Sequence, residues 1–272
     1  MPHFKAADGT GLFYTTAGTG PPVLALAGLT RNTGDFDHVA PHLPCRLIRM
    51  DYRGRGQSDW ADPASYTVAQ EAADTVALLD HLGLDRAAVL GTSRGGLIAM
   101  MLAATHKDRL TGVALNDIGP EIAPEGLKVI EDYIGRNPDQ TTYDEAARVR
   151  ARTWVQFEGV DHARWLHEVH NHYAQTPEGL VIRYDPRLRE AVFESANVQP
   201  ASDLWPLYDA LHGLPLCLIR GENSDLLAPA TWDGMRARRP DAIAAEVPGR
   251  GHVPFLDEPQ AVQALQRWIA AL

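Results

Sequence analysis

The sequence predicts an α/β fold, with a mostly parallel sheet, helices on both faces and an inserted helical segment. Short apolar runs alternate with helical patterns over residues 1–118, and the same alternation returns over residues 201–272. Between them, residues 119–200 have a different texture, rich in charged and aromatic side chains. Alternating strands and helices are typical of a parallel sheet that is covered on both faces. We therefore expect 1–118 and 201–272 to form one core, and 119–200 to form a helical lid inserted into it.

The expected strands are short apolar runs bounded by glycine, proline or polar residues. They cover residues 22–27, 45–50, 86–90, 110–116, 214–220 and 242–247, and residues 6–8 with 10–16 resemble an antiparallel hairpin at the sheet edge. Thr67 is positioned to cap a helix that Gly83 ends. A run over 96–104 is too long for a strand, and an amphipathic helix is expected over 259–271.

Composition excludes several classes of protein. The net charge of −10 argues against binding to nucleic acid, which favours a basic face. No run approaches the ~20 apolar residues of a membrane span, and the N-terminus lacks the apolar segment of a signal peptide, so we expect a cytoplasmic protein without membrane association. Cys45 and Cys217 lie in or beside apolar runs and are interpreted as buried small side chains, not as a disulfide or metal site.

Residues 91–95, Gly-Thr-Ser-Arg-Gly, place a serine between an expected strand and an expected helix. Glycines two residues before and after Ser93 remove the Cβ atoms that would crowd a tight turn. Such a turn lifts the serine hydroxyl above the ends of the strands. A serine hydroxyl is a poor nucleophile at neutral pH, so this interpretation also requires a general base and a carboxylate that orients it.

The base is predicted from chain order, because the acid and then the histidine follow the serine in this kind of site. Only His212 and His252 lie beyond residue 200. His252 belongs to a glycine-rich loop, 248–255, between the last expected strand and the last expected helix, where it can reach back over the strand ends. His212 precedes a strand and is expected at the opposite edge of the sheet. We therefore predict His252 as the general base.

Three carboxylates are candidates for the orienting acid. Asp225 is preferred, because it lies in the loop after the strand 214–220 at a depth suited to the histidine ring N–H. Glu222 lies nearer the end of that strand. Asp117 directly follows the strand 110–116, a known alternative place for the acid in relatives of this fold, although it can also be a turn or helix-cap residue before Gly119-Pro120.

Two backbone N–H groups are needed to stabilise an oxyanion. One is predicted from Arg94, the residue after the nucleophile, at a helix N-terminus where the helix dipole assists. The other is predicted from Leu29, because Gly28-Leu29-Thr30 follows the strand 22–27 and allows close approach of the backbone.

Together these residues resemble the lidded α/β-hydrolases. The resemblance is carried by Ala27-Gly28-Leu29, by the run Asp51 to Asp59, by the turn at Ser93, by Gly221 to Asp225 and by Gly251-His252. It departs from many relatives at Ala27, where histidine is common, and at Arg94, where methionine or glutamine is common. The resemblance implies acyl transfer by a serine, since an aspartate at position 93 would have indicated an alkyl-enzyme ester.

Other polar and aromatic residues are candidates for substrate binding. Arg31 lies just beyond Leu29 and is suited to a substrate carboxylate, or it pairs with Asp35 or Asp37 on the surface. Trp154 and Phe157 are candidate pocket walls. The histidines of the lid, at 162, 167, 170 and 172, lack metal-binding spacing, because three of them cannot share one helical face, so no metal is expected.

The sequence therefore predicts a serine hydrolase that cleaves a small-molecule carboxylic ester or lactone through an acyl-enzyme on Ser93, without a cofactor. Carbon–carbon bond hydrolysis of a diketone-type substrate, thioester cleavage and perhydrolysis use the same three residues and remain alternatives. A receptor-like relative that binds a ligand with vestigial turnover is the alternative from another class of protein.

Overall fold

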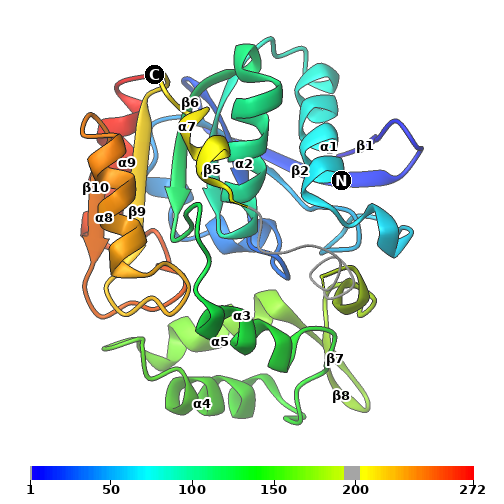
Figure 1. Ribbon diagram of the computed structural model, residues 1–272. Helices are drawn as coiled ribbons and strands as arrows, with labels where there is room; N and C mark the ends of the chain where they lie inside the picture. The colour runs from blue at the N-terminus through cyan, green and yellow to red at the C-terminus, as the bar shows by residue number, and fades with distance from the viewer. Residues whose placement is uncertain (1, 193–202) are drawn as a thin grey trace.

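An eight-stranded sheet organises this protein, whose computed structural model describes residues 2–192 and 203–272 (Figure 1). From one edge to the other the strands are β1 (His3–Lys5), β2 (Gly11–Ala17), β4 (Arg46–Met50), β3 (Pro22–Leu26), β5 (Ala87–Thr92), β6 (Leu110–Asn116), β9 (Leu216–Gly221) and β10 (Ile243–Val247). β1 and β2 pair antiparallel, β2 and β4 pair antiparallel, and every pair from β4 to β10 is parallel. The predicted fold class is confirmed. A hairpin does lie at the sheet edge, but its first strand is β1, and residues 6–8, expected to form that strand, connect β1 to β2 instead.

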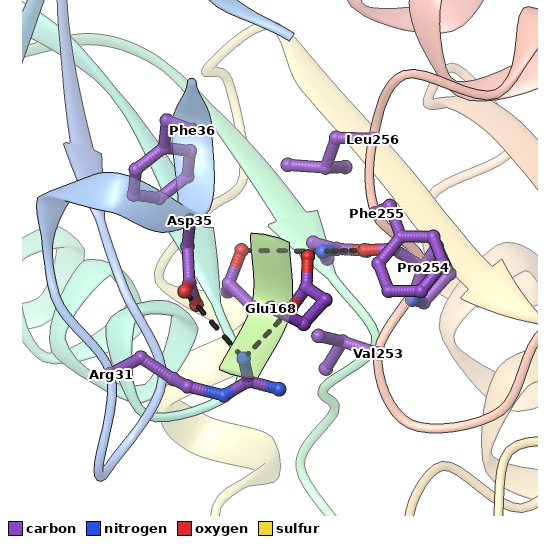
Figure 2. A pocket seen from close by; sticks show the side chains of 10 residues that line it. Arg31, Asp35, Phe36, Glu168, Val253, Pro254, Phe255 and Leu256 are labelled. Atoms are coloured by element: carbon purple, nitrogen blue, oxygen red, sulfur yellow. Dashed lines mark hydrogen bonds and ion pairs between the residues drawn. The ribbon is translucent and has the colours of Figure 1, made fainter. Parts of the chain in front are cut away.

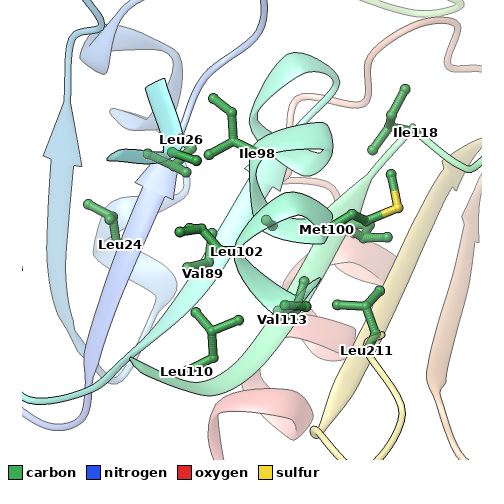
Figure 3. Packing of buried hydrophobic residues seen from close by; sticks show 14 of the residues in the cluster. Leu24, Leu26, Val89, Ile98, Met100, Leu102, Leu110, Val113, Ile118 and Leu211 are labelled. Carbon is green, nitrogen blue, oxygen red and sulfur yellow. The ribbon is translucent and has the colours of Figure 1, made fainter. Parts of the chain in front are cut away.

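Apolar side chains of the central strands alternate between two cores, one on each face of the sheet. Leu24 and Leu26 of β3 point into the first core, and Val23 and Ala25 point into the second. The first core is covered by α1 (Val68–His81), α2 (Arg94–Thr105), α7 (Trp205–Asp209) and α8 (Pro229–Arg238). Figure 3 shows part of this core, where Ile98 and Leu102 of α2 lie over Leu26 and Val89 of the sheet. The second is covered by α9 (Pro259–Ile269) and the 3₁₀ helices η1 (Thr33–Phe36) and η2 (Ala40–His42). Both faces are buried, which explains why these strands are continuously apolar.

Local signals account for the ends of several elements. The side chain of Thr67 accepts a 3.1 Å hydrogen bond from the N–H of Gln70, as expected of the residue that caps α1. Two further 3₁₀ helices, η3 (Pro63–Ser65) and η4 (Lys107–Arg109), lead into α1 and β6. Cys45 and Cys217 are both buried free thiols. Among the described residues, no helix has the length and apolarity needed to cross a membrane.

Residues 119–192, which follow β6, lie beyond the ends of the parallel strands (Figure 1). Ser93 directly follows β5, so it lies at the same edge of the sheet. Residues 119–192 contain α3 (Pro124–Tyr133), α4 (Tyr143–Thr153), α5 (His162–His172) and a hairpin of β7 (Tyr173–Thr176) and β8 (Gly179–Ile182). The hairpin adds two short strands to a segment that was expected to be helical. Each of its strands has four residues, too few for a recognisable alternation of polar and apolar side chains. Residues 119–200 are called the insertion below.

Candidate active site

Ser93 lies at a strained turn between β5 and α2, with a positive φ of 50°. Two glycines make this turn possible. A Cβ atom on Gly95 would lie 2.1 Å from the carbonyl oxygen of Leu26, and one on Gly91 would lie 2.4 Å from the carbonyl oxygen of Gly95. Neither position therefore accepts a side chain. Backbone strain of this kind is found where a side chain must be held at a functional site.

The structure brings Ser93, His252 and Asp117 together in one hydrogen-bonded row. His252 Nε2 is 2.9 Å from Ser93 Oγ, and His252 Nδ1 is 2.8 Å from Asp117 Oδ2. A carboxylate only accepts hydrogen bonds, so the proton of a neutral His252 lies on Nδ1. Nε2 is then free to accept the proton of the serine hydroxyl. This is the arrangement in which a histidine can act as a general base.

The partner of His252 is thus Asp117, and the preference for Asp225 is corrected. Asp225 is half-buried in the loop after β9, and within the described residues its side chain makes no hydrogen bond or ion pair. Glu222, the third candidate, is exposed and its side chain accepts from the N–H of Gly249. The reason lies in the geometry of adjacent parallel strands: the loops after β6 and β9 meet at the same place, so either can supply the carboxylate.

Asp117 is held in place by the loop that was expected to carry the acid. It is fully buried, and its φ of 54° turns the side chain back over the sheet. Its Oδ1 accepts from the N–H of Gly221 at 2.8 Å, and its Oδ2 accepts from Ser224 Oγ at 2.6 Å. It is not a helix cap, because α3 begins only at Pro124. Ser224 was not among the predicted site residues, and its one signal in the sequence is a short hydroxyl side chain next to Asp225.

The two predicted oxyanion donors lie on either side of Ser93. Arg94 is the first residue of α2, and its N–H has no acceptor among the described residues. The same is true of the N–H of Leu29. A Cβ atom on Gly28 would lie 3.9 Å from Ser93 Cβ, so the loop that carries Leu29 passes directly beside the serine.

A buried cluster of charges connects these two donors. Glu71, fully buried on α1, accepts from Arg94 Nε at 2.7 Å and forms a 2.9 Å ion pair with Arg55. Arg55 in turn donates from Nε to the carbonyl oxygen of Leu29 at 3.0 Å. Burial alone would raise the pKa of Glu71, but the two guanidinium groups lower it overall, so the carboxylate is ionised. No local sequence pattern predicts this link, because its three side chains come from segments far apart in the chain.

Arg31 is held at the edge of a small pocket by two acidic side chains (Figure 2). Its Nη1 lies 3.6 Å from Asp35 Oδ1 and 3.2 Å from Glu168 Oε2 of α5, and it also contacts His172 Nε2. The pocket wall opposite is formed by residues 253–256, which directly follow His252. Arg31 is therefore ion-paired with Asp35, one of the two alternatives for this residue, and Asp37 pairs with Arg49 instead.

Asp35, Glu168 and His172 also resemble a set of metal ligands, because one donor atom from each lies within 4.8 Å of the others. The guanidinium group of Arg31 contacts all three. A cation already lies among these acceptors, so the group is better described as the partner set of Arg31 than as a metal centre.

Trp154 and Phe157 belong to an aromatic group that lies against the loop of His252. Their ring centroids are 5.5 Å apart, and Phe157 is 5.3 Å from the ring of Phe255. A Cβ atom on Gly251 would lie 3.0 Å from the ring of Phe157, which places this ring on the residue before His252.

Polar contacts fasten the insertion to the same loop. The side chain of Asn223 donates to the carbonyl oxygen of Gln156 at 3.1 Å. The N–H of Glu158 donates to the carbonyl oxygen of Gly249 at 2.9 Å. Arg164 of α5 binds both carboxylate oxygens of Asp257, at 2.9 and 2.6 Å. The insertion is thus tied to the segments on both sides of His252.

Comparisons with known proteins agree with this architecture. A model of the alpha/beta hydrolase fold matches residues 21–259. The chain is 35% identical to a 3-hydroxybutyrate-oligomer hydrolase of Cupriavidus necator, over 92% of this chain and 89% of that protein. It is 27% identical to a pimeloyl-[acyl-carrier protein] methyl ester esterase of Neisseria meningitidis, over 90% and 75%. The crystal structure of an alpha/beta hydrolase from Novosphingobium aromaticivorans superimposes with a TM-score of 0.93 at 36% identity, covering 100% of this chain and 98% of that one.

Proposed function

We propose that this chain, which belongs to the alpha/beta hydrolase fold family, is a serine hydrolase of carboxylic esters or lactones. The observation that carries the proposal is the row from Ser93 Oγ through His252 to Asp117, with contacts of 2.9 and 2.8 Å. Relatives whose names state hydrolysis of a hydroxybutyrate oligomer and of a methyl ester support the same class of substrate.

In the first step Ser93 Oγ attacks the ester carbonyl carbon while His252 Nε2 takes the hydroxyl proton. The carbonyl electron pair moves onto oxygen, where the N–H groups of Leu29 and Arg94 stabilise the negative charge. Asp117 keeps the proton of His252 on Nδ1 and stabilises the imidazolium that forms. When the tetrahedral intermediate collapses, the alcohol leaves with the proton from Nε2, and the acyl group stays on Ser93.

In the second step His252 accepts a proton from water, and the resulting hydroxide attacks the acyl-enzyme. Collapse of this second intermediate releases the carboxylic acid, and the proton returns from His252 to Ser93 Oγ. A lactone follows the same course, with the alcohol and the acid remaining in one product. Both steps use the side chains of Ser93, His252 and Asp117, the N–H groups of Leu29 and Arg94, the substrate and water.

We further propose that the insertion acts as a lid over this site. The contacts of Glu158 and Arg164 support this role, because they place the insertion against the segments that flank His252, and Asn223 adds a contact from the loop after β9. Its aromatic residues Trp154 and Phe157 would then form a wall for the acyl or alcohol part of the substrate.

A panel of p-nitrophenyl esters and lactones of graded length tests the proposed function. We expect multiple turnovers by the wild type and none above background by Ser93→Ala. A fluorophosphonate should label the wild type covalently and leave Ser93→Ala unlabelled. Labelling or turnover that persists in Ser93→Ala would overturn the assignment of the nucleophile. If the wild type makes fewer than one turnover per protein on every ester but cleaves a thioester or a diketone, that compound gives the substrate class of the site instead.

A further inference from the structure

Arg150, on α4 of the insertion, is a buried arginine without a carboxylate partner. Five arginines are buried in the described part of the chain. Four of them form ion pairs: Arg53 with Asp74, Arg55 with Glu71, Arg220 with Glu246 and Arg239 with Asp241. For Arg150, which is 8% exposed, no carboxylate oxygen of the described residues lies within the 4.0 Å of an ion pair. A buried charge without a counter-charge is costly, so a protein that keeps one usually has a use for it.

The groups in direct contact with the Arg150 guanidinium are neutral, and Arg31, Asp35 and Glu168 lie further away. Its Nη1 lies 2.7 Å from His172 Nδ1, and its Nη2 donates to the hydroxyl of Tyr173 at 3.3 Å. The guanidinium group stacks over the rings of Trp154 and Tyr173, at 4.8 and 5.6 Å from their centroids. These aromatic faces attract a cation and leave its charge unneutralised.

His172 cannot satisfy the arginines on both of its sides. Burial, Arg31 and Arg150 together hold the pKa of His172 well below its usual value, so the imidazole is neutral. A neutral imidazole accepts a hydrogen bond at one nitrogen only, yet Arg150 faces Nδ1 and Arg31 faces Nε2. One arginine therefore meets a ring N–H with its own N–H group. Arg31 has Asp35 and Glu168 as acceptors, whereas Arg150 has none of that kind.

The surroundings fit a ligand with a single negative charge. Asp35, Glu168 and Asp257 form ion pairs with Arg31 and Arg164, and none of them forms one with Arg150. One carboxylate would supply the single counter-charge that the Arg150 guanidinium lacks, whereas a phosphate dianion carries more charge than one guanidinium group neutralises. A planar carboxylate also fits the fork of a guanidinium group.

The position of Arg150 relates this charge to Ser93. Along α4 and the following turn, the guanidinium group stacks on Trp154, Trp154 packs on Phe157, and Phe157 lies on Gly251 beside His252. Two aromatic side chains, Trp154 and Phe157, therefore separate Arg150 from the loop of His252, on the side of the insertion. A substrate group bound there would be several bonds from the carbonyl that Ser93 attacks.

We propose that Arg150, with the hydroxyl of Tyr173, binds a carboxylate at the end of the substrate remote from the scissile bond. The preferred substrates are then esters that carry a free carboxylate, such as short hydroxy-acid oligomers or half-esters of dicarboxylic acids. This inference rests on the proposed hydrolysis by Ser93 and names the substrate class of that same site. Arg150 acts here in binding and takes no part in the chemical steps.

Matched charged and neutral esters test this inference. One pair places the charge on the acyl side: mono-p-nitrophenyl adipate against p-nitrophenyl hexanoate. The other places it on the alcohol side: 3-acetoxybutyrate against 3-acetoxybutyramide. In at least one pair, we expect kcat/KM of the wild type to be about tenfold or more higher for the charged ester, as for a hydrogen bond to a charged group. Arg150→Met should abolish this ratio through KM, and Arg150→Lys should keep part of it.

Arg148→Met is the matched control, because Arg148 lies on the same helix, is exposed and pairs with Asp144. It should leave the ratio at the wild-type value. A wild type that prefers neither charged ester, or an Arg150→Met variant that keeps the ratio, would overturn the inference even if the esterase activity stands.

Binding without turnover separates this inference from the proposed function. In Ser93→Ala, monomethyl adipate should raise the melting temperature, and dimethyl adipate should raise it less. Adding Arg150→Met should remove that difference. This result would support the carboxylate site even if no ester were hydrolysed, and an equal effect of both adipates would overturn it. Circular dichroism of each variant checks that it is folded.

Discussion

Ser224 Oγ donates a 2.6 Å hydrogen bond to Asp117 Oδ2, the carboxylate oxygen that also faces His252 Nδ1. Ser224 belongs to the loop after β9 and Asp117 directly follows β6, so the loops after two neighbouring strands together orient the histidine. The N–H of Gly221, from the same loop as Ser224, binds the other oxygen of the carboxylate. Three donors thus fix a carboxylate that has no contact with solvent.

This relationship predicts different outcomes for two aspartates. Asp117→Asn should lower kcat by about 10⁴-fold, because an amide at this place no longer holds the proton of His252 on Nδ1. Asp225→Asn should leave kcat within about twofold of the wild type, since surface changes away from a network have small effects. The measurement is the initial rate with p-nitrophenyl butyrate at saturation.

The melting temperature of each variant provides the control, because Asp117 is buried and its substitution can also weaken the fold. If Asp225→Asn loses more activity than Asp117→Asn, then Asp225 and not Asp117 orients His252 in the working enzyme.

Glu71 offers a test of how the two oxyanion donors are positioned. Glu71→Gln keeps the shape of the side chain but leaves the buried guanidinium groups of Arg55 and Arg94 without their counter-charge. We expect the free energy of unfolding to fall by about 3–5 kcal/mol, as when one partner of a buried ion pair is removed. We also expect kcat to fall by about 10- to 10³-fold, because Arg55 would no longer fix the carbonyl of Leu29 and one oxyanion donor would be misplaced.

Asp74→Asn is the matched control for Glu71→Gln. Asp74 is buried on the same helix and pairs with Arg53, and it has no contact with Leu29 or Arg94. It should therefore lower the stability to urea by a similar amount while changing kcat much less. Equal losses of kcat in the two variants, measured well below their melting temperatures, would show that general loosening of α1 is responsible and not the link to the oxyanion donors.

The parts of the site that depend on local backbone geometry could be predicted from the sequence. The turn at Ser93 is one example, because the glycines at 91 and 95 are required by contacts within a few residues or with the adjacent strand. The position of His252 followed in the same way from a glycine-rich loop between a strand and a helix. Both predictions depend on the order of strands, loops and helices along the chain, and this order can be taken directly from the sequence.

The parts that depend on contacts between distant segments could not be predicted. Asp117 and Asp225 both follow strands that are neighbours in the sheet, and only the φ of Asp117 and the donors around it decide between them. Arg150 is a similar case. In the sequence it is one of several arginines in a polar helix, and its burial results from packing against α5 and the hairpin, which no local pattern reveals.

His172 predicts how stability depends on pH. Its imidazole is buried, faces Arg31 and Arg150, lies near His167, and is 3.8 Å from both Asp35 and Glu168. Burial first, and then the positive groups, lower its pKa well below the usual 6.5. Below pH 6.5 the unfolded chain therefore binds a proton at this residue that the folded chain does not. Its contribution to stability is complete above pH 6.5 and is lost as the pH falls, by about 1.4 kcal/mol per pH unit while His172 stays neutral.

Asp35 acts in the opposite direction, because its pKa is raised to about 7. Between 3.8 and 7 the folded chain holds a proton at Asp35 that the unfolded chain releases, so this term favours the folded state as the pH falls. The effects of His172 and Asp35 on the free energy of unfolding therefore partly cancel in the wild type as the pH falls. The effect of the histidine is therefore best measured as a difference between variants that both retain Asp35.

We expect His172→Gln to lose less stability than the wild type between pH 7.5 and pH 5, by about 1–2 kcal/mol in urea denaturation. His170→Gln, on the exposed face of the same helix, is the control and should follow the wild-type profile. If the His172→Gln and wild-type profiles run parallel, His172 takes up its proton in the folded state. The two arginines would then have moved apart, and the insertion would be anchored at this point by the carboxylates of Asp35 and Glu168 instead of by the neutral ring.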